Sequence, residues 1–199
     1  MTKRLFDIFF GALTLIFFSG ILLICILIAS ADTKSFGLFV QNRIGQNGII
    51  FKIYKIKTFS DYTKEVTQIG AFFRRSKLDE LPQLVNILLG QMSFVGPRPD
   101  IAGYADLLKG ADQIILTVKP GITGLASLKY RNEEALLHQQ ENPLLYNDTV
   151  IWPDKVRINK WYVENRTLWM DVVILFCTIA PSEFEVEEFM KSKWNYNLF

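Results

Sequence analysis

The pattern of apolar and polar positions divides this chain into one long apolar run and a mixed remainder. From Ile8 to Ile28 the sequence is apolar for 21 residues, interrupted only by Gly11, Thr14, Ser19 and Gly20. As an α-helix this run would be about 31 Å long, which matches the hydrocarbon core of a bilayer. It predicts a membrane-inserted helix, which we assign to residues 1–30.

The residues around this run leave two topologies open. Lys3 and Arg4 precede it and further basic residues follow it, so the positive-inside bias draws both ends to the cytoplasm. Ser19-Gly20 is a weak point, because Gly lowers helix propensity and Ser bonds back to backbone carbonyls. The helix either crosses the bilayer once or bends at Ser19 and Gly20 and re-enters the same face. A cleaved signal peptide fits poorly, since no small-residue cleavage site follows.

Beyond Asp32 the pattern predicts short strands and helices, which we assign to a membrane-associated domain over residues 31–199. The fold class is α+β and mostly helical, with amphipathic interfacial helices and a few short strands. The predicted strands are Leu38–Val40 and Ile49–Ile53, around a turn at Arg43–Gly48. The predicted helices are Ile69–Phe73, Leu81–Leu89, Ile101–Leu108, Val156–Trp161 and Leu168–Ala180, with a polar, helical insertion at 131–154. Val95–Pro99 and Lys119–Gly124 are rich in Pro or Gly and predict irregular turns.

Composition excludes several classes of protein. Half of the residues are apolar and 21% are charged, which does not fit disorder, collagen or a coiled coil. With His138 as the one histidine, neither a multi-His zinc site nor a serine–histidine hydrolase is expected. Cys25 and Cys177 lie in distant apolar runs, so neither a disulfide framework nor a cysteine metal site is expected. The sequence contains no phosphate-binding glycine loop and no dinucleotide fingerprint.

Charge is distributed unevenly along the chain. Residues 1–131 carry 16 Lys or Arg and 9 Asp or Glu, whereas residues 132–199 carry 6 and 11. This is either an accident of surface charge or a sign that the first part binds phosphate or anionic lipid. We expect membrane lipid as a partner and no nucleic acid.

Asp79-Glu80 is the pair most suggestive of chemistry. Carboxylates before an apolar helix are ordinary N-terminal capping in most proteins. Here Arg74, Arg75 and Lys77 precede the pair and Pro82 fixes the backbone after it. A carboxylate among cations is expected to have a low pKa and to stay ionised, as a nucleophile or a metal ligand must.

Several basic residues are candidate phosphate ligands. Arg98 lies between Pro97 and Pro99, and a rigid arginine suits bidentate phosphate recognition, although a plain surface turn explains it equally well. Gly121 and Gly124 would allow the backbone to approach a phosphate closely. The weaker candidates, each of which could equally be solvated surface, are Lys55, Lys57, Arg74, Lys119 and Arg131.

The motifs resemble those of a known family. LDELPQLVNIL at 78–88 and GQMSFVGPRP at 90–99 resemble the bacterial sugar transferase family, the small monotopic polyprenyl-phosphate phosphoglycosyl transferases. KRLFD at 3–7, FKIYKIKT at 51–58 and KPGITGLA at 119–126 match three further blocks of that family. The ordered blocks extend over most of residues 3–180.

The resemblance implies an enzyme that moves a phospho-sugar from a UDP-sugar to undecaprenyl phosphate and releases UMP, with Mg²⁺ as cofactor. Asp79 would be the nucleophile that forms a phosphosugar–aspartyl intermediate, Glu80 would bind the magnesium ion, and Arg98 would bind phosphate. The N-terminal helix would be re-entrant, with the catalytic domain on the cytoplasmic face of a bacterial inner membrane. Such an enzyme starts the synthesis of a surface polysaccharide or glycoconjugate.

The chain departs from the family pattern at four places. Gly20 replaces the proline of a Ser-Pro helix break, and Lys57 replaces an arginine. Ser127–Arg131 replaces Gln-Val-Asn-Gly-Arg and precedes a longer insertion, and Asn159 replaces an aspartate. The sugar and the oligomeric state therefore stay open. Two other functions are considered: a membrane-anchored scaffold without turnover, and a lipid phosphatase that works through an aspartyl phosphate.

Overall fold

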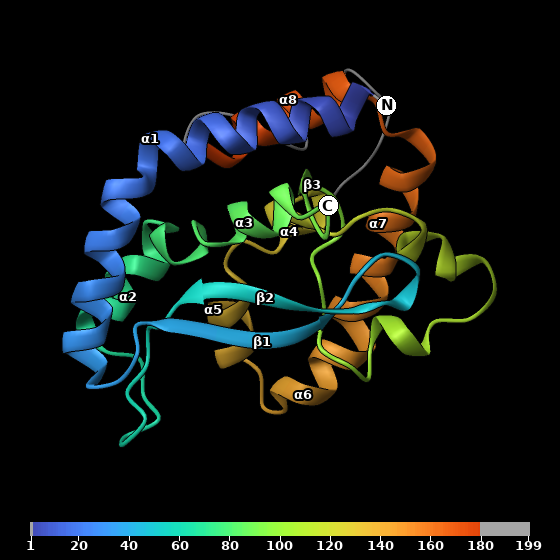
Figure 1. The fold of residues 1–199 in the computed structure, drawn as a ribbon. Coiled ribbons are helices and arrows are strands. Elements are labelled where there is room, and N and C mark those ends of the chain that lie inside the picture. Colours follow the sequence, from blue (N-terminus) through green and yellow to red (C-terminus); the bar gives the residue numbers. More distant parts are fainter. Residues whose placement is uncertain (1, 180–199) are drawn as a thin grey trace. The chain divides into compact units, whose positions relative to one another are not determined.

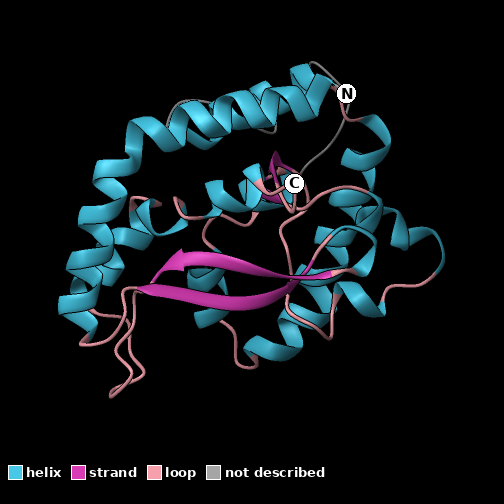
Figure 2. Cartoon of the chain, in the orientation of Figure 1, coloured by secondary structure: helices cyan, strands magenta, loops and turns pink. Residues whose placement is uncertain are grey.

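The computed structural model describes residues 2–179. Over these residues the chain is mostly helical, with two small two-stranded sheets (Figure 2), which confirms the predicted fold class. Packing divides the described residues into two compact units: 2–45 with 49–93, and 46–48 with 94–179. By its contacts the N-terminal helix belongs to the first unit, and the functional boundary at residue 30 stays a prediction.

The first unit begins with α1 (Thr2–Thr33), a single helix that bends near its middle (Figure 1). Ser19 Oγ donates a hydrogen bond to the Ile16 carbonyl at 2.8 Å, a back-bond that favours bending. No atom lies within 4 Å of the position that a Cβ on Gly20 would take. The helix is long and apolar enough to cross a membrane, and many of its large apolar side chains are exposed. Its apolar surface faces outward, as expected of a helix in lipid.

Both halves of α1 pack against the first unit. Near the N-terminus, Arg4 donates hydrogen bonds from its two terminal nitrogens to the carbonyls of Ile87 (2.6 Å) and Leu88 (2.9 Å). In the second half, Cys25 and Ala29 are buried in one cluster with Ile56 and Phe73. The helix is therefore held at both ends by the same body of protein.

A hairpin and two short helices complete this unit. Strands β1 (Leu38–Ile44) and β2 (Ile50–Ile56) pair antiparallel with Leu38 opposite Ile56, so the predicted strands are confirmed and extended. α2 (Gln68–Arg75) is followed by a 3₁₀ turn (Leu78–Glu80) and by α3 (Gln83–Leu88). Asn86 joins α3 to β2, because its Nδ2 donates to the Lys52 carbonyl (2.7 Å) and its Oδ1 accepts from the Tyr54 amide (3.2 Å).

The second unit is built around α7 (Trp152–Asn165) and α8 (Leu168–Ile179). Their buried residues form one core with those of α4 (Leu125–Lys129), and the Tyr162 hydroxyl donates to Asp171 Oδ1 at 2.6 Å within it. β3 (Ser93–Val95), of which Phe94 and Val95 belong to this unit, pairs with β4 (Gly121–Thr123). The remaining elements are 3₁₀ helices at Ala105–Leu107 and Gly110–Thr117, α5 (Glu133–His138), α6 (Pro143–Tyr146) and a π turn at Asn147–Ile151.

Several sequence predictions can now be compared with these elements. The helix predicted at Ile101–Leu108 is wrong, because only Ala105–Leu107 form a 3₁₀ turn. Gly103 has φ +104°, and Asp106 Oδ1 accepts hydrogen bonds from the amides of Gly103 (2.7 Å) and Tyr104 (3.0 Å), which replace helical bonds. The helical insertion and both final helices are confirmed, whereas β3 and β4 occupy part of the segments predicted as irregular. The acidic and aromatic tail at 183–199 lies outside the described residues.

Candidate active site

Asp79 and Glu80 lie in the short connection between α2 and α3. Lys77 has the left-handed conformation (φ 59°, ψ 14°), which is uncommon for a residue with a side chain, and it turns the chain out of α2. The 3₁₀ turn Leu78–Glu80 follows, and the amide of Glu80 donates to the Lys77 carbonyl at 3.2 Å. The two carboxylates are thus fixed on a tight backbone turn inside the first unit.

Both carboxylates of this pair are buried, with exposed fractions of 8% for Asp79 and 7% for Glu80. Burial, followed by the nearby charge of Glu80, raises the pKa of Asp79, while Lys55, Lys77 and Arg74 oppose that rise. The low pKa expected from the surrounding cations is therefore wrong, because loss of solvent outweighs their attraction. The Asp79 carboxylate is more basic than an ordinary aspartate.

The three candidate phosphate ligands of the first unit, Lys55, Lys57 and Arg74, have different surroundings. Lys55 forms an ion pair with Glu80 (Nζ to Oε1, 3.4 Å), and Arg74 reaches from α2, where its Nε donates to Thr58 Oγ1 at 3.0 Å. Lys57 instead donates to Asp61 and to Ser35 Oγ, and its ammonium lies 5.3 Å from the centre of the Phe59 ring. The structure thus brings Lys55 and Arg74 to the carboxylate pair, whereas Lys57 is bonded to other side chains.

The carboxylate pair fits a hard divalent cation. Asp79 Oδ1 is buried and has no hydrogen-bond partner among the described residues. In the part of the chain that the structure describes, no cluster of three or more His, Cys, Asp or Glu side chains forms a closed metal cage. Mg²⁺ commonly binds through one or two carboxylates together with water and substrate phosphates, so this pair is a suitable donor set.

Sequence reasoning missed two polar residues of α3. Gln83 (1% exposed) and Asn86 (0%) are both buried, Gln83 one turn after Asp79 and Asn86 in the contact with β2. The available signal was the presence of two amides in the otherwise apolar segment Leu81–Leu89, because a buried amide requires a bonding partner.

In the second unit, Arg98 is exposed between two buried prolines, Pro97 and Pro99. This segment is held against Lys119–Gly124: the Gly96 amide donates to the Thr123 carbonyl (2.9 Å) and the Gly121 amide to the Pro97 carbonyl (2.8 Å). Two of the predicted phosphate ligands, Arg98 and Lys119, are therefore carried by segments that are bonded to each other.

The glycines of these segments allow close approach between backbones. A Cβ on Gly121 would lie 2.2 Å from the Gly96 nitrogen, and one on Gly124 would lie 2.3 Å from the Gly96 oxygen. Both distances are far too short for real atoms. The close approach that the sequence suggested for a phosphate is in fact made by the protein's own chain.

Two other positions singled out in the sequence, Arg131 and Asn159, lie at or within helices of the second unit. Arg131 donates from its Nη2 to the carbonyls of Cys177 (3.0 Å) and Thr178 (3.3 Å), where cationic groups complement the end of α8. Asn159 is buried in α7 with 6% of its surface exposed. Arg131 therefore caps a helix in this conformation.

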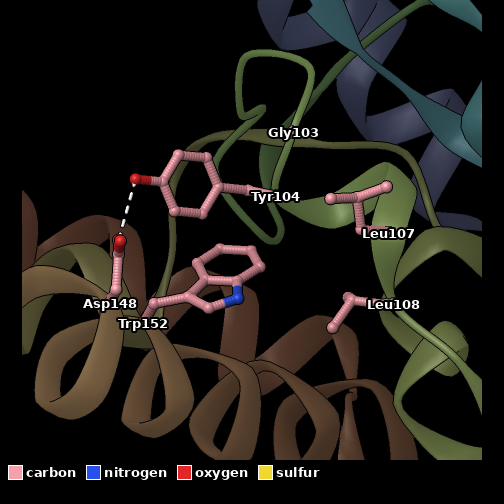
Figure 3. Close-up of a pocket in the computed structure, with 6 residues that line it drawn as sticks. All are labelled: Gly103, Tyr104, Leu107, Leu108, Asp148 and Trp152. Carbon is pink, nitrogen blue, oxygen red and sulfur yellow. Dashed lines mark hydrogen bonds between the residues drawn. The ribbon is translucent and has the colours of Figure 1, made fainter.

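A separate pocket of about 430 Å³ also lies in the second unit (Figure 3). The Tyr104 and Trp152 rings meet edge to face with centres 5.2 Å apart, and the Tyr104 hydroxyl donates to Asp148 Oδ1 at 3.0 Å. Leu107 and Leu108 form the opposite wall (Figure 3). The pocket thus uses Asp148 from the insertion that sets this chain apart from the family pattern.

Comparison with known proteins decides the family. The profile described as bacterial sugar transferase matches residues 1–182. The chain belongs to this family. The chain is 36% identical over 194 residues to the UDP-glucose:undecaprenyl-phosphate glucose-1-phosphate transferase of Klebsiella pneumoniae, covering 89% of this chain and 39% of that protein. It is 31% identical over 206 residues to the exopolysaccharide production protein ExoY of Rhizobium meliloti, covering 90% and 84%.

The relatives differ in length. The uncharacterized sugar transferase EpsL of Bacillus subtilis is 33% identical over 187 residues, which cover 89% of this chain and 85% of EpsL. The chain therefore spans about two fifths of the Klebsiella protein but most of ExoY and EpsL. Family membership and the long apolar helix together indicate that the protein associates with a membrane.

Proposed function

We propose that this protein is a phosphoglycosyl transferase that moves a phospho-sugar from a UDP-sugar to undecaprenyl phosphate, a polyprenyl phosphate, and releases UMP. The observation that carries the proposal is the buried Asp79–Glu80 pair, with Lys55, Arg74 and Lys77 around it and with an Asp79 oxygen that no described residue hydrogen-bonds. The names of the relatives support it, since the Klebsiella protein is called a UDP-glucose:undecaprenyl-phosphate glucose-1-phosphate transferase. ExoY, named for exopolysaccharide production, supports a role in starting polysaccharide synthesis.

Asp79 is the proposed nucleophile. One of its carboxylate oxygens attacks the phosphorus that bears the sugar, and the bond from that phosphorus to the bridging oxygen breaks. The electron pair of that bond leaves with UMP, so no proton has to move. An oxygen of undecaprenyl phosphate then attacks the same phosphorus and releases the Asp79 carboxylate. Its raised pKa supports this role, because a more basic carboxylate is a stronger nucleophile once it is ionised.

Glu80 is the proposed magnesium ligand, beside Asp79. The ion, when bound, would offset the negative charge of the diphosphate and so ease the approach of an anionic nucleophile. Lys55, paired with Glu80 at 3.4 Å, holds that carboxylate in place and contributes positive charge. In the second unit, Arg98 and Lys119 are proposed phosphate ligands, and the fixed fork of Arg98 suits two oxygens at once.

The proposed topology is re-entrant and places the catalytic units on the cytoplasmic face. As a straight rod, α1 with its 32 residues would be about 48 Å long and would bring its ends to opposite faces of a core about 30 Å thick. Arg4 and Ala29, near the two ends, both contact the first unit. A bend at Ser19 and Gly20 reconciles these contacts with an apolar surface in lipid, and the basic flanks favour the cytoplasmic side.

The test is UMP release from a panel of UDP-sugars, with Mg²⁺ and undecaprenyl phosphate in detergent. We expect one sugar to support continuous turnover. Without lipid acceptor, the same sugar should give at most about one UMP per enzyme molecule, because the intermediate stays on Asp79. Asp79→Asn should abolish both reactions.

Other results of this assay would indicate other functions or another mechanism. A folded protein that releases no UMP from any sugar of the panel would be a scaffold, and the proposal would fail. Product release that needs no undecaprenyl phosphate and continues past one equivalent would indicate a phosphatase with water as acceptor. UMP that forms only after lipid is added would point to direct transfer, with Asp79 as a base or metal ligand.

A further inference from the structure

Gln83 is a buried polar residue whose amide nitrogen forms no hydrogen bond within residues 2–179. Its side chain is 1% exposed, and its Nε2 donor has no hydrogen-bond partner among the described residues. Burial removes the water that such a group binds in the unfolded chain, and no protein bond compensates for that loss. Native proteins leave few buried donors unpaired, so each one calls for an explanation.

Asn86, on the same helix, shows what a structural amide looks like at this place. It is 0% exposed, and its Nδ2 donates both to the Lys52 carbonyl and to Gln91 Oε1, each at 2.7 Å. Its Oδ1 accepts from the Tyr54 amide at 3.2 Å. α3 therefore satisfies one buried amide completely and leaves the donor of Gln83 open.

The unpaired donor lies one turn from the unpaired acceptor of Asp79. Leu81 (φ −53°, ψ −38°) and Pro82 (φ −59°, ψ −21°) are right-handed helical, so the chain continues helically from the carboxylate pair into α3. Side chains four residues apart in such a segment share a face. An amide donor and a carboxylate acceptor, both buried and both without a partner among the described residues, are therefore carried by side chains about one helical turn apart.

Their chemistry defines what would occupy that place. An N–H group donates hydrogen bonds to anionic oxygens and cannot bind a metal cation. A carboxylate oxygen, in contrast, binds a cation or attacks an electrophilic atom. A phosphoryl group offers both at once, because its non-bridging oxygens are anionic and its phosphorus is electrophilic. A neutral amide also suits the position next to a nucleophile, since a lysine there would lower the basicity of Asp79.

We propose that Gln83 is a catalytic residue whose Nε2 donates a hydrogen bond to a non-bridging oxygen of the phosphoryl group that Asp79 attacks. This inference rests on the proposed function and adds a residue to it. Gln83 gains and loses no proton. Its donor holds the phosphorus in line with Asp79 and stabilises the charge on the equatorial oxygens during transfer.

The first test compares the binding of UDP and UMP, with Mg²⁺, to the detergent-solubilised protein by calorimetry. UDP carries the β-phosphate that corresponds to the transferred group, and UMP lacks it. Gln83→Met removes the donor at similar volume, and it should weaken UDP binding about tenfold, the effect of one hydrogen bond to a charged group, while UMP binding changes less than twofold. The proposal would be overturned if Gln83→Met weakened the binding of UDP and UMP equally, or if it weakened the binding of neither nucleotide.

The second test measures thermal unfolding without ligand. Gln83→Met should unfold at the wild-type temperature or above it, because it removes a buried donor that has no partner. Asn86→Leu is the control, and it should unfold at a clearly lower temperature, since it breaks three hydrogen bonds. If Gln83→Met lowered the unfolding temperature as much as Asn86→Leu, Gln83 would be a structural residue and the inference would be overturned.

The third test separates this inference from the proposed function. With a donor that wild-type protein accepts, Gln83→Met should slow the release of the first UMP at least tenfold, and Gln83→Glu more, because it adds a third carboxylate. Wild-type rates in both variants would overturn the role of Gln83 and leave the transferase function standing. A wild-type protein that releases no UMP from any donor would refute the transferase function, and the first two tests would still decide whether Gln83 contacts a phosphate.

Discussion

The carboxylate of Asp7, in the second turn of α1, accepts a hydrogen bond from the hydroxyl of Ser93 at 3.0 Å across 86 residues of sequence. Both residues are buried, with exposed fractions of 2% and 1%. A buried charge is retained only where donors compensate for its lost hydration. This bond therefore ties the start of the apolar helix to the strand that follows α3.

Ser93→Ala should destabilise the protein by about 1–3 kcal/mol, because it removes a donor to a buried carboxylate. Thermal or denaturant unfolding in detergent measures the effect. Ser19→Ala in α1 is the control, since among the described residues that exposed hydroxyl bonds only to the Ile16 carbonyl, and it should change stability by less than about 0.5 kcal/mol. Equal effects of the two substitutions would show that the Asp7 contact adds nothing.

Cysteine labelling tests the re-entrant topology. A cysteine introduced at Thr2, before the helix, and one at Tyr62, which is 81% exposed in the first unit, should respond alike to an impermeant reagent. Both should stay unlabelled in intact spheroplasts and react once the membrane is breached. Native Cys25 and Cys177 are buried and set the background. Labelling of position 2 alone in intact spheroplasts would mean that α1 crosses the bilayer.

Asp79→Asn should abolish UMP release and, in EDTA at neutral pH, leave the unfolding temperature equal to or above that of wild type. The pKa of Asp79 is raised in the folded protein, chiefly by burial, so the ionised carboxylate disfavours folding at any pH above that raised value. A neutral amide removes this penalty. A large drop in the unfolding temperature would show that the carboxylate is bonded within the fold and is not held ready for substrate.

The Asp154 carboxylate should affect folding stability in the opposite direction to that of Asp79 as the pH changes. Burial, the largest influence, raises its pKa, but hydrogen bonds from Lys129, Tyr130 and Arg157 outweigh it and hold the pKa below its usual value. The ionised carboxylate therefore stabilises the fold at pH above about 4, the value in the unfolded chain, and this is lost as pH falls through the folded value. Asp154→Asn should cost about 1–3 kcal/mol at pH 7 and less at pH 3, as measured by urea unfolding. A difference that is constant with pH would contradict the assignment.

Gly121→Ala should disrupt the second unit, because its new Cβ would meet the Gly96 nitrogen at 2.2 Å and the Thr123 carbonyl oxygen at 2.5 Å. Overpacking against backbone costs about 1–3 kcal/mol or more. Gly20→Ala is the control, since nothing lies within 4 Å of its Cβ and alanine favours a helix by up to about 1 kcal/mol. In detergent, the unfolding temperature should therefore fall for Gly121→Ala and rise for Gly20→Ala.

Sequence patterns predicted those features that depend on local regularity. The apolar run became α1, the alternation around Arg43–Gly48 became a hairpin, and the apolar period at Leu168–Ala180 became α8. The helix expected at Ile101–Leu108 failed because Asp106 bonds to nearby amides, a competition that side-chain periodicity does not register.

At the candidate site the sequence indicated the residues but not their environment. Charges near Asp79 in the sequence suggested a low pKa, yet the direction is set by solvent exclusion, which depends on how the units fold. The glycines at 121 and 124 indicated a close approach, and only the packing shows that Gly96 is what approaches. Lys57 looked equivalent to Lys55 until its bonds to Asp61 and Ser35 were seen.

The bond between Asp7 and Ser93 also sets an order of events during synthesis. At roughly 5–20 residues per second, a ribosome adds the 60 residues from the end of α1 at Thr33 to Ser93 in about 3–12 s. During that interval the whole apolar helix has been synthesised, while the hydroxyl that bonds to its buried carboxylate has not. The contact between Asp7 and Ser93 can therefore form only after Ser93 has left the ribosome, so this part of the packing of α1 is completed late.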